Sequence, residues 1–150
     1  MLLRKIRLLF VGCLIGLWAF SSQAAEWTMA SGYPKSNFHT QNIIKFIDDV
    51  KSGSSVKINL NPNDTLIKLD AIKTSLQRGQ IPIGEIRFGI YGNEDPMYIL
   101  AGLPFIAPDY ASAWLLKEVK HAYLQEKFNK KGLRILYTSP WPGQGFYTKF

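Results

Sequence analysis

Two alternating apolar periodicities constrain the fold of this chain more than any other feature. Apolar residues recur at every second position in four segments, which predicts strands at 27–32, 56–60, 81–91 and 133–138. Spacings of three and four predict helices between them at 36–52, 65–78 and about 109–131. Strands alternating with helices are typical of an α/β domain with a largely parallel sheet covered by helices.

The expected helices have recognisable ends and faces. Ser36 is the expected N-cap of the first helix and Asp109 that of the long third one, with Gly53 and Gly132 as their stops. The expected inward faces contain these apolar residues: Ile43, Phe46, Ile47, Val50; Leu66, Leu69, Ile72, Leu76; Leu116, Val119, Tyr123, Phe128. In the strand at 81–91 the apolar phase slips at Gly84–Glu85, which predicts a bulge or an exit into a loop.

The first 24 residues have the pattern of a Sec-type signal peptide. A basic start precedes an apolar run from Leu8 to Phe20, and the small residues that follow suit cleavage after Ala24. The run is shorter than the roughly 20 residues needed to cross a bilayer, which disfavours a retained anchor. We therefore expect periplasmic localisation, with no stable membrane insertion after cleavage.

Loss of this segment leaves 25–150, enough for one domain but not for two. Three of the 18 basic residues go with it, so the remainder, with 11 acidic residues, has a formal charge of +4. The only cysteine, Cys13, is also lost, which excludes disulfides and thiolate chemistry from the exported part. The remaining lysines are typical of a solvated helix face, so we expect no nucleic-acid partner.

Ligands of parallel α/β sheets bind beside the carboxyl ends of the strands. Four loops of this chain are expected at such ends, and they contain most of its unusual residues: 31–39, 62–65, 84–95 and 140–145. The sequence therefore predicts one binding edge.

Five short motifs occur in order along these loops and their flanks. They are FHTQN at 38–42, GQIPIGE at 79–85, NEDP at 93–96, LPFIA at 103–107 and WPGQGFYTK at 141–149. In this order, behind a signal peptide, they resemble the solute-binding subunits of tripartite ATP-independent periplasmic (TRAP) transporters, the DctP-like family. The resemblance covers 26–150 but only the first half of the family's usual length.

The resemblance implies a periplasmic-binding-protein-like lobe, with 25–150 as the incomplete N-terminal lobe of a two-lobed protein and the second lobe missing. It implies non-catalytic binding of a small organic anion, a carboxylate, with delivery to the TRAP permease subunits and with no cofactor or metal. The family's arginine that pairs with the substrate carboxylate would lie beyond Phe150, so we expect a truncated chain with impaired binding. The sequence also departs from the family at Asn63–Asp64–Thr65–Leu66, at Gly143 and at Arg87.

Six residues are the candidate ligand contacts: Phe38, His39, Glu85, Asn93, Trp141 and Gln144. Glu85 would accept hydrogen bonds from a substrate, or else pair with Arg87 two residues on. Phe38 and His39 would wall the pocket and donate to an anion near a helix N-terminus, or else serve as a hydrophobic staple and a cap.

The other three candidates lie on later loops. Asn93 belongs to a turn in which Asp95 and Pro96 begin a helix, so contact with ligand or a purely structural role are both open. Trp141 would pack over the substrate or plug the lobe core. Gln144 would offer a donor and an acceptor to the ligand, or satisfy loop backbone. For Arg87, solvent exposure or a salt bridge to Glu85 is the favoured interpretation.

Two other function classes compete with the binding subunit. A small secreted hydrolase is disfavoured, because the chain lacks a Gly-x-Ser-x-Gly elbow, a His-Glu-x-x-His motif and, after cleavage, any cysteine. The two histidines, His39 and His121, are too few for a typical catalytic zinc site. A standalone single-lobe accessory protein that contacts a partner is the stronger alternative.

Overall fold

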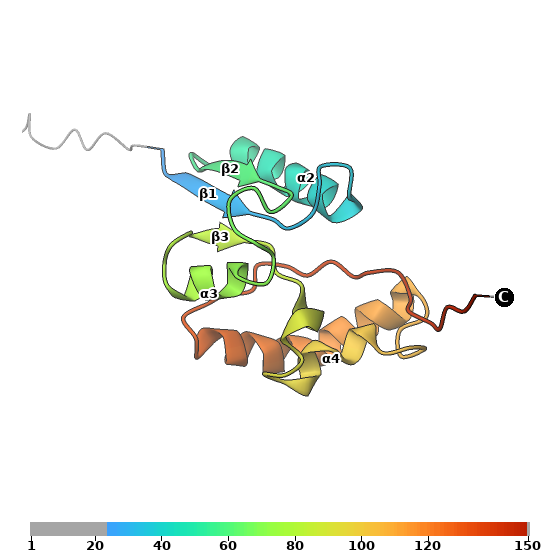
Figure 1. Cartoon of the computed structure of the whole chain (residues 1–150). Helices are drawn as coiled ribbons and strands as arrows, with labels where there is room; N and C mark the ends of the chain where they lie inside the picture. Colours follow the sequence, from blue (N-terminus) through green and yellow to red (C-terminus); the bar gives the residue numbers. More distant parts are fainter. Residues whose placement is uncertain (1–23, 150) are drawn as a thin grey trace, which may run out of the picture.

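The computed structural model describes residues 24–149 (Figure 1). Three strands form a parallel sheet in the order β2-β1-β3: β1 is Glu26–Ala30, β2 is Lys57–Asn61 and β3 is Ile83–Gly84. Helices flank the sheet, which confirms the expected α/β class. None of the helices in the described part is long and apolar enough to cross a membrane. The predicted signal peptide lies outside the described residues except for Ala24, so its cleavage stays a prediction.

Helix α2, Phe38–Gly53, packs its apolar face on the sheet. Its buried Ile43 joins Met29, Ile58 and Ile83 of the three strands in one cluster, with the other apolar residues of the predicted face around it. The N-cap is Asn37, one residue after the expected Ser36. The side-chain Oδ1 of Asn37 accepts the backbone N–H of His39 at 2.9 Å, which satisfies a donor that the first turn of a helix leaves free.

The predicted helix at 65–78 is wrong for its first half. Helix α3 is only Ile72–Gln77, and turns and bends occupy 65–71. Asn63 and Asp64 both have positive φ angles, and Asp64 Oδ1 accepts the N–H of Leu69 at 2.9 Å. This side-chain bond holds the chain in a loop where the apolar spacing alone suggested a helix.

The long strand predicted at 81–91 is also wrong, because β3 has two residues. The phase slip marks the strand's exit: Glu85 N–H still donates to Ala30 O at 2.9 Å, but β1 ends at Ala30 and offers no further partner. Three short 3-10 helices follow, η2 at Phe88–Tyr91, η3 at Pro96–Tyr98 and η4 at Leu100–Gly102.

Helix α4, Tyr110–Asn129, has the predicted N-cap and stop. Asp109 accepts the N–H of Ser112 at 2.7 Å, and Gly132 follows with φ +71°. Its buried residues are Lys120, Leu124 and Phe128, one per turn. Val119 is 71% exposed, so its predicted inward position is wrong.

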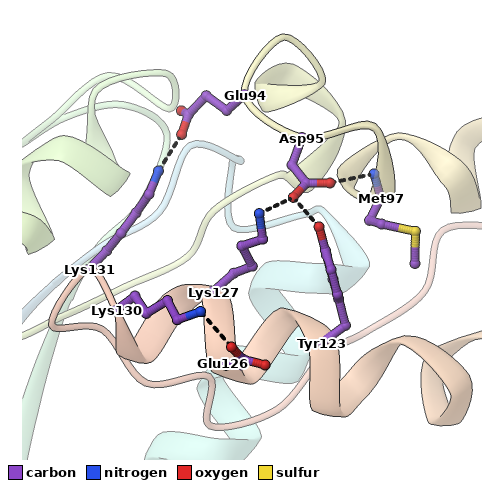
Figure 2. Close-up of polar contacts among 8 residues, drawn as sticks. All are labelled: Glu94, Asp95, Met97, Tyr123, Glu126, Lys127, Lys130 and Lys131. Atoms are coloured by element: carbon purple, nitrogen blue, oxygen red, sulfur yellow. Dashed lines mark hydrogen bonds and ion pairs between the residues drawn. The ribbon is translucent and has the colours of Figure 1, made fainter.

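Polar contacts as well as apolar ones hold α4 against the segment at 93–98 (Figure 2). Asp95 Oδ2 accepts the hydroxyl of Tyr123 at 2.6 Å and pairs with Lys127 Nζ at 3.1 Å. Glu94 pairs with Lys131 at 2.7 Å and also with the buried Lys73. These ion pairs join α3, the 93–98 turn and α4 into one unit.

The strand predicted at 133–138 is wrong, because the described segment after α4 has no strand pairing. It runs back from the end of α4 toward α2 (Figure 1). Leu133 and Ile135 pack on the core cluster of α4, and the ring of Tyr137 lies 5.3 Å from that of Phe46 in α2. The segment thereby brings the loop at 140–145 beside the N-terminus of α2.

Candidate functional site

An open cavity of about 1140 Å³ lies between the sheet, α4 and the segment that follows α4. It exceeds the 300–1,000 Å³ typical of small-molecule sites. Most of its lining is apolar. Polar groups line it at the carboxyl ends of β1 and β3 and also along α4, where Lys117, the buried Lys120 and His121 contribute. Residues of three of the four predicted loops line the region at the strand ends, so we take it as the candidate site: Tyr33, His39, Glu85, Arg87, Trp141 and Gln144.

Glu85 is the carboxylate of this site, and the end of β3 positions it. Its Oε2 accepts the hydroxyl of Ser31 at 2.5 Å, and Ser31, fully buried at the end of β1, also accepts the N–H of Tyr33 at 3.4 Å. Burial raises the pKa of Glu85, and the Ser31 hydrogen bond opposes this in part. Within residues 24–149 Glu85 has no ion pair, so the alternative of a salt bridge to Arg87 is not realised.

His39 and Tyr33 each place an unsatisfied polar atom in the site wall. His39 is only 6% exposed, and neither its Nε2 nor the hydroxyl of Tyr33 has a hydrogen-bond partner among the described residues. Burial lowers the pKa of His39 and raises that of Tyr33, although the nearby Arg87 guanidinium opposes the rise at Tyr33; both groups are neutral at pH 7. Buried polar atoms without a partner are rare in native proteins, and they point to a ligand or water at this position.

The loop that holds these atoms is fixed from two sides. Thr40 Oγ1 donates to the carbonyl of Tyr33 at 3.2 Å from the first turn of α2. The same carbonyl accepts the N–H of Asn63 at 2.9 Å, which ties on the turn after β2. These two hydrogen bonds fix the backbone of Tyr33, so this part of the site wall is already ordered without a ligand.

Trp141 closes the site with its ring. The ring centroid lies 4.3 Å from that of His39 and 5.4 Å from those of Phe38 and Tyr33. The exposed guanidinium of Arg87 lies 5.9 Å from the same ring. A Cβ on Gly143 would lie 2.4 Å from the carbonyl oxygen of Pro108, so only glycine permits the close approach that seats this loop.

Two predicted contacts have other surroundings. Gln144 lines the cavity, but its side-chain Nε2 donates to the carbonyl of Pro142 at 2.7 Å. Its backbone carbonyl accepts the N–H of Phe105 at 3.1 Å. Asn93 is exposed and does not line the cavity. The structure therefore brings His39, Glu85, Trp141 and Gln144 together on the cavity wall. It places the exposed Phe38 against Trp141 but outside the lining, and it leaves Asn93 apart.

Sequence reasoning did not select Ser31 and Tyr33, and it gave Arg87 no ligand role. Their place in the chain could have indicated them, because Ser31 and Tyr33 follow the buried end of β1 in a loop that was expected at the binding edge. No group of three or more potential metal ligands occurs in residues 24–149. The described residues of the site offer a ligand hydrogen-bonding groups and aromatic rings.

Solved structures of solute receptors resemble this chain in both sequence and fold. DctP6 of Bordetella pertussis, an extracytoplasmic solute receptor binding pyroglutamic acid, is 38% identical with a TM-score of 0.73 over 75% of this chain and 38% of its own. DctP7 of the same organism, which also binds pyroglutamic acid, is 34% identical with a TM-score of 0.75 over 79% and 40%. No protein-family model and no curated protein matches the chain.

A third receptor, a marine metagenome TRAP solute-binding protein specific for pyroglutamate, is 34% identical with a TM-score of 0.76. It matches 81% of this chain, which spans 40% of its length. These relatives are transport receptors and not enzymes. Over the two fifths of their length that it spans, this chain belongs to the DctP-like solute-binding proteins of TRAP transporters.

Proposed function

We propose that this chain is the periplasmic solute-binding subunit of a TRAP transporter for a small organic carboxylate, and that pyroglutamate or a close analogue is the ligand. Three receptors at 34–38% identity, each described as binding pyroglutamate, support the ligand class. The observation that carries the proposal is the pair of unsatisfied buried atoms, His39 Nε2 and Tyr33 hydroxyl, beside Trp141 at the strand ends.

The mechanism is closure of a two-lobed receptor around its ligand, followed by delivery to the TRAP permease. Residues 24–149 supply one wall of such a cleft. We propose that a second lobe supplies the other wall and a cation for the ligand carboxylate. Residues 24–149 on their own would then bind weakly, with a dissociation constant on the order of millimolar or above. The predicted signal peptide, with cleavage after Ala24, would deliver it to the periplasm.

Expression of the full chain with its own N-terminus tests localisation and binding together. Mass spectrometry of the periplasmic fraction should find a chain that begins at Ala25. Ligand-observed NMR should detect weak binding of L-pyroglutamate. Retention of residues 1–24 would contradict the export proposal, and no response to any carboxylate would contradict the binding proposal.

Complementation tests the incomplete cleft. Co-expression with the remaining part of Bordetella pertussis DctP6 should raise the affinity for L-pyroglutamate by at least about 100-fold, because two walls desolvate and pair the ligand where one cannot. The DctP6 part alone is the control. A complex that forms without a gain in affinity would show that the single lobe is not an impaired half of such a receptor.

A standalone accessory role is the second candidate, and one observation favours it. Apolar side chains of α4 are exposed, among them Trp114, Leu115 and Val119. A surface of this kind is typical of protein contacts. Stable capture of the permease by the chain without any ligand would support this role.

A further inference from the structure

Helix α4 contributes a buried cation to the cavity wall, and the strand-end site does not use it. Lys120 is only 5% exposed and lines the cavity. Burial lowers its pKa, and no carboxylate of the described residues offsets this effect. Lysines are almost never buried without a partner, because an unpaired charge loses its hydration. Lys120 therefore marks a position where an anion would be stabilised.

The surroundings of Lys120 on this wall are apolar. Leu116, Lys120 and Leu124 are four residues apart along α4, and all three line the cavity. The buried Ile81 and Ile83, at the start of β3, line the same cavity. An anion that pairs with Lys120 would thus need an apolar body to fill the space beside it.

The neighbouring lysine on α4 is already engaged. Lys117 Nζ pairs with Glu118 at 2.8 Å and lies 4.1 Å from the ring centroid of Trp114. Lys120 has no such contact within residues 24–149, so it is the cation of this wall that remains available.

The charge of the whole cavity also favours an anion. Among the described lining residues four side chains are cationic and one is acidic: Arg87, Lys117, Lys120 and Arg134 against Glu85. The acidic one accepts a hydrogen bond from Ser31 and forms no ion pair with Lys120. A mostly apolar pocket with a few charged groups of one sign suits a ligand with an apolar body and a single opposite charge.

We propose that the α4 wall is a second binding site, which takes an amphipathic carboxylate such as a medium-chain fatty acid. The carboxylate pairs with Lys120 in a charge-assisted hydrogen bond, and the aliphatic chain occupies the apolar part of the cavity. This site is separate from the one at the strand ends, and the inference does not rest on the proposed function.

The test compares octanoate with 1-octanol, which has the same chain without the charge. We expect the full chain, in ligand-observed NMR, to bind octanoate at least about 10-fold more tightly, because a hydrogen bond to a buried charged group contributes more than one between neutral groups. In ¹H–¹⁵N spectra octanoate should shift the signals of residues 116–124 of α4. Equal affinities, or shifts confined to the strand-end loops, would overturn the inference.

Substitutions of Lys120 assign the preference to its charge. Lys120→Met keeps an apolar side chain of similar length, so it should abolish the preference for octanoate and raise the melting temperature of the free protein. Lys120→Arg keeps the charge and should retain a preference. Lys130→Met, on the same helix at a side chain that is 69% exposed, is the matched control and should behave like the wild type. An unchanged preference in folded Lys120→Met would refute the role of Lys120.

Two competition experiments distinguish the cavity from other places where octanoate could bind. L-Pyroglutamate should not displace octanoate, since displacement would place octanoate at the strand ends and overturn the inference while leaving the proposed function intact. Co-expression with the remaining part of DctP6 should preserve octanoate binding. Its loss there would show that polypeptide fills the cavity and would also overturn the inference. Leu115→Gln, on the exposed face of α4, should leave octanoate binding unchanged, and a loss would assign it to that face.

Discussion

Glu85 is the carboxylate of the candidate site, and no cation among residues 24–149 forms an ion pair with it. Its carboxylate accepts one strong hydrogen bond from Ser31, and burial nevertheless raises its pKa. A raised native pKa means that the folded state holds the proton more tightly than the unfolded chain does. This contribution to stability is fully present below the unfolded pKa and is lost as the pH rises through the native pKa.

Glu85→Gln should therefore stabilise the protein at pH 7, because the amide keeps an acceptor for Ser31 and removes the buried charge. The gain should shrink as the pH falls through the raised native pKa of Glu85, where the wild-type carboxyl takes up a proton. Thermal unfolding followed by circular dichroism across this range is the measurement. Glu118→Gln on the exposed side of α4 is the control, and an equal gain there would show that net charge is responsible.

Single residues of the site were predictable where a motif or a strand end marked them. His39, Glu85 and Trp141 lie at the binding edge that the alternation of elements predicts, and the structure gathers them there. Tyr33 was not selected because its importance depends on the unsatisfied hydroxyl, and no sequence pattern records hydrogen-bond satisfaction. Asn93 was selected from a turn motif whose direction depends on tertiary packing.

At the scale of elements, the start of α2 allows a clean comparison of two neighbouring polar residues. Asn37 caps the helix through its side chain, and Ser36 is exposed outside it. Asn37→Ala should lower the free energy of unfolding by about 1 kcal/mol, as is usual for the loss of an N-cap. Ser36→Ala should change it little. Urea unfolding measures both, and equal effects would contradict the assigned cap.

Helix α4 depends on Asp95 for its attachment to the preceding loop (Figure 2). Asp95 caps η3 by accepting the N–H of Met97 at 2.9 Å, and it also binds Tyr123 and Lys127 of α4. The Tyr123 hydrogen bond, and after it that from Met97, lower the pKa of Asp95. Its contribution to stability is therefore present above the unfolded pKa and is lost as the pH falls through the native pKa.

Asp95→Asn should destabilise the protein at pH 7 and lessen this loss on acidification. Near-ultraviolet circular dichroism, which senses the packing of Tyr123, together with urea unfolding at pH 7 and pH 3 would measure the change. Glu126→Gln, in an exposed pair with Lys130, is the control and should have little effect. A variant with the pH dependence of the wild type would refute the role of Asp95.

The elements themselves were predictable where local chemistry and tertiary partners agree. Helices α2 and α4 have both an apolar face and a cap, and they form close to the predicted positions. The segment at 133–138 alternates like a strand, with Leu133 and Ile135 inward, yet it has no ladder partner in the described chain. Strand formation needs a neighbour, which periodicity alone cannot supply.

At the scale of the whole molecule, exposed apolar residues continue from α4 to the last described residues. The exposed set includes Tyr110, Trp114, Leu115, Val119, Phe146 and Tyr147. Large apolar side chains exposed in this number are uncommon in stable monomers. The chain alone should therefore self-associate at micromolar concentration.

Leu115→Lys should reduce this association, because it places a charge in the middle of the exposed apolar face of α4. Light scattering coupled to gel filtration would follow the mass as a function of concentration. Ala122→Lys, an exposed position on the same helix, adds the same charge without removing a large apolar side chain. A wild-type chain that stays monomeric at high concentration, or equal effects of both variants, would contradict the prediction.

The central place of β1 in the sheet has a consequence for the order in which the fold assembles. β1 is the earliest strand of the chain, yet its partners come later, since Met29 pairs with Leu60 of β2 and with Ile83 of β3. Parallel pairs between such distant segments form slowly, because the intervening loop must close first. Helices α2 and α4 can each form locally within microseconds, whereas β1 needs both β2 and β3 as partners. The first strand of the chain is therefore complete only after two later segments have closed onto it.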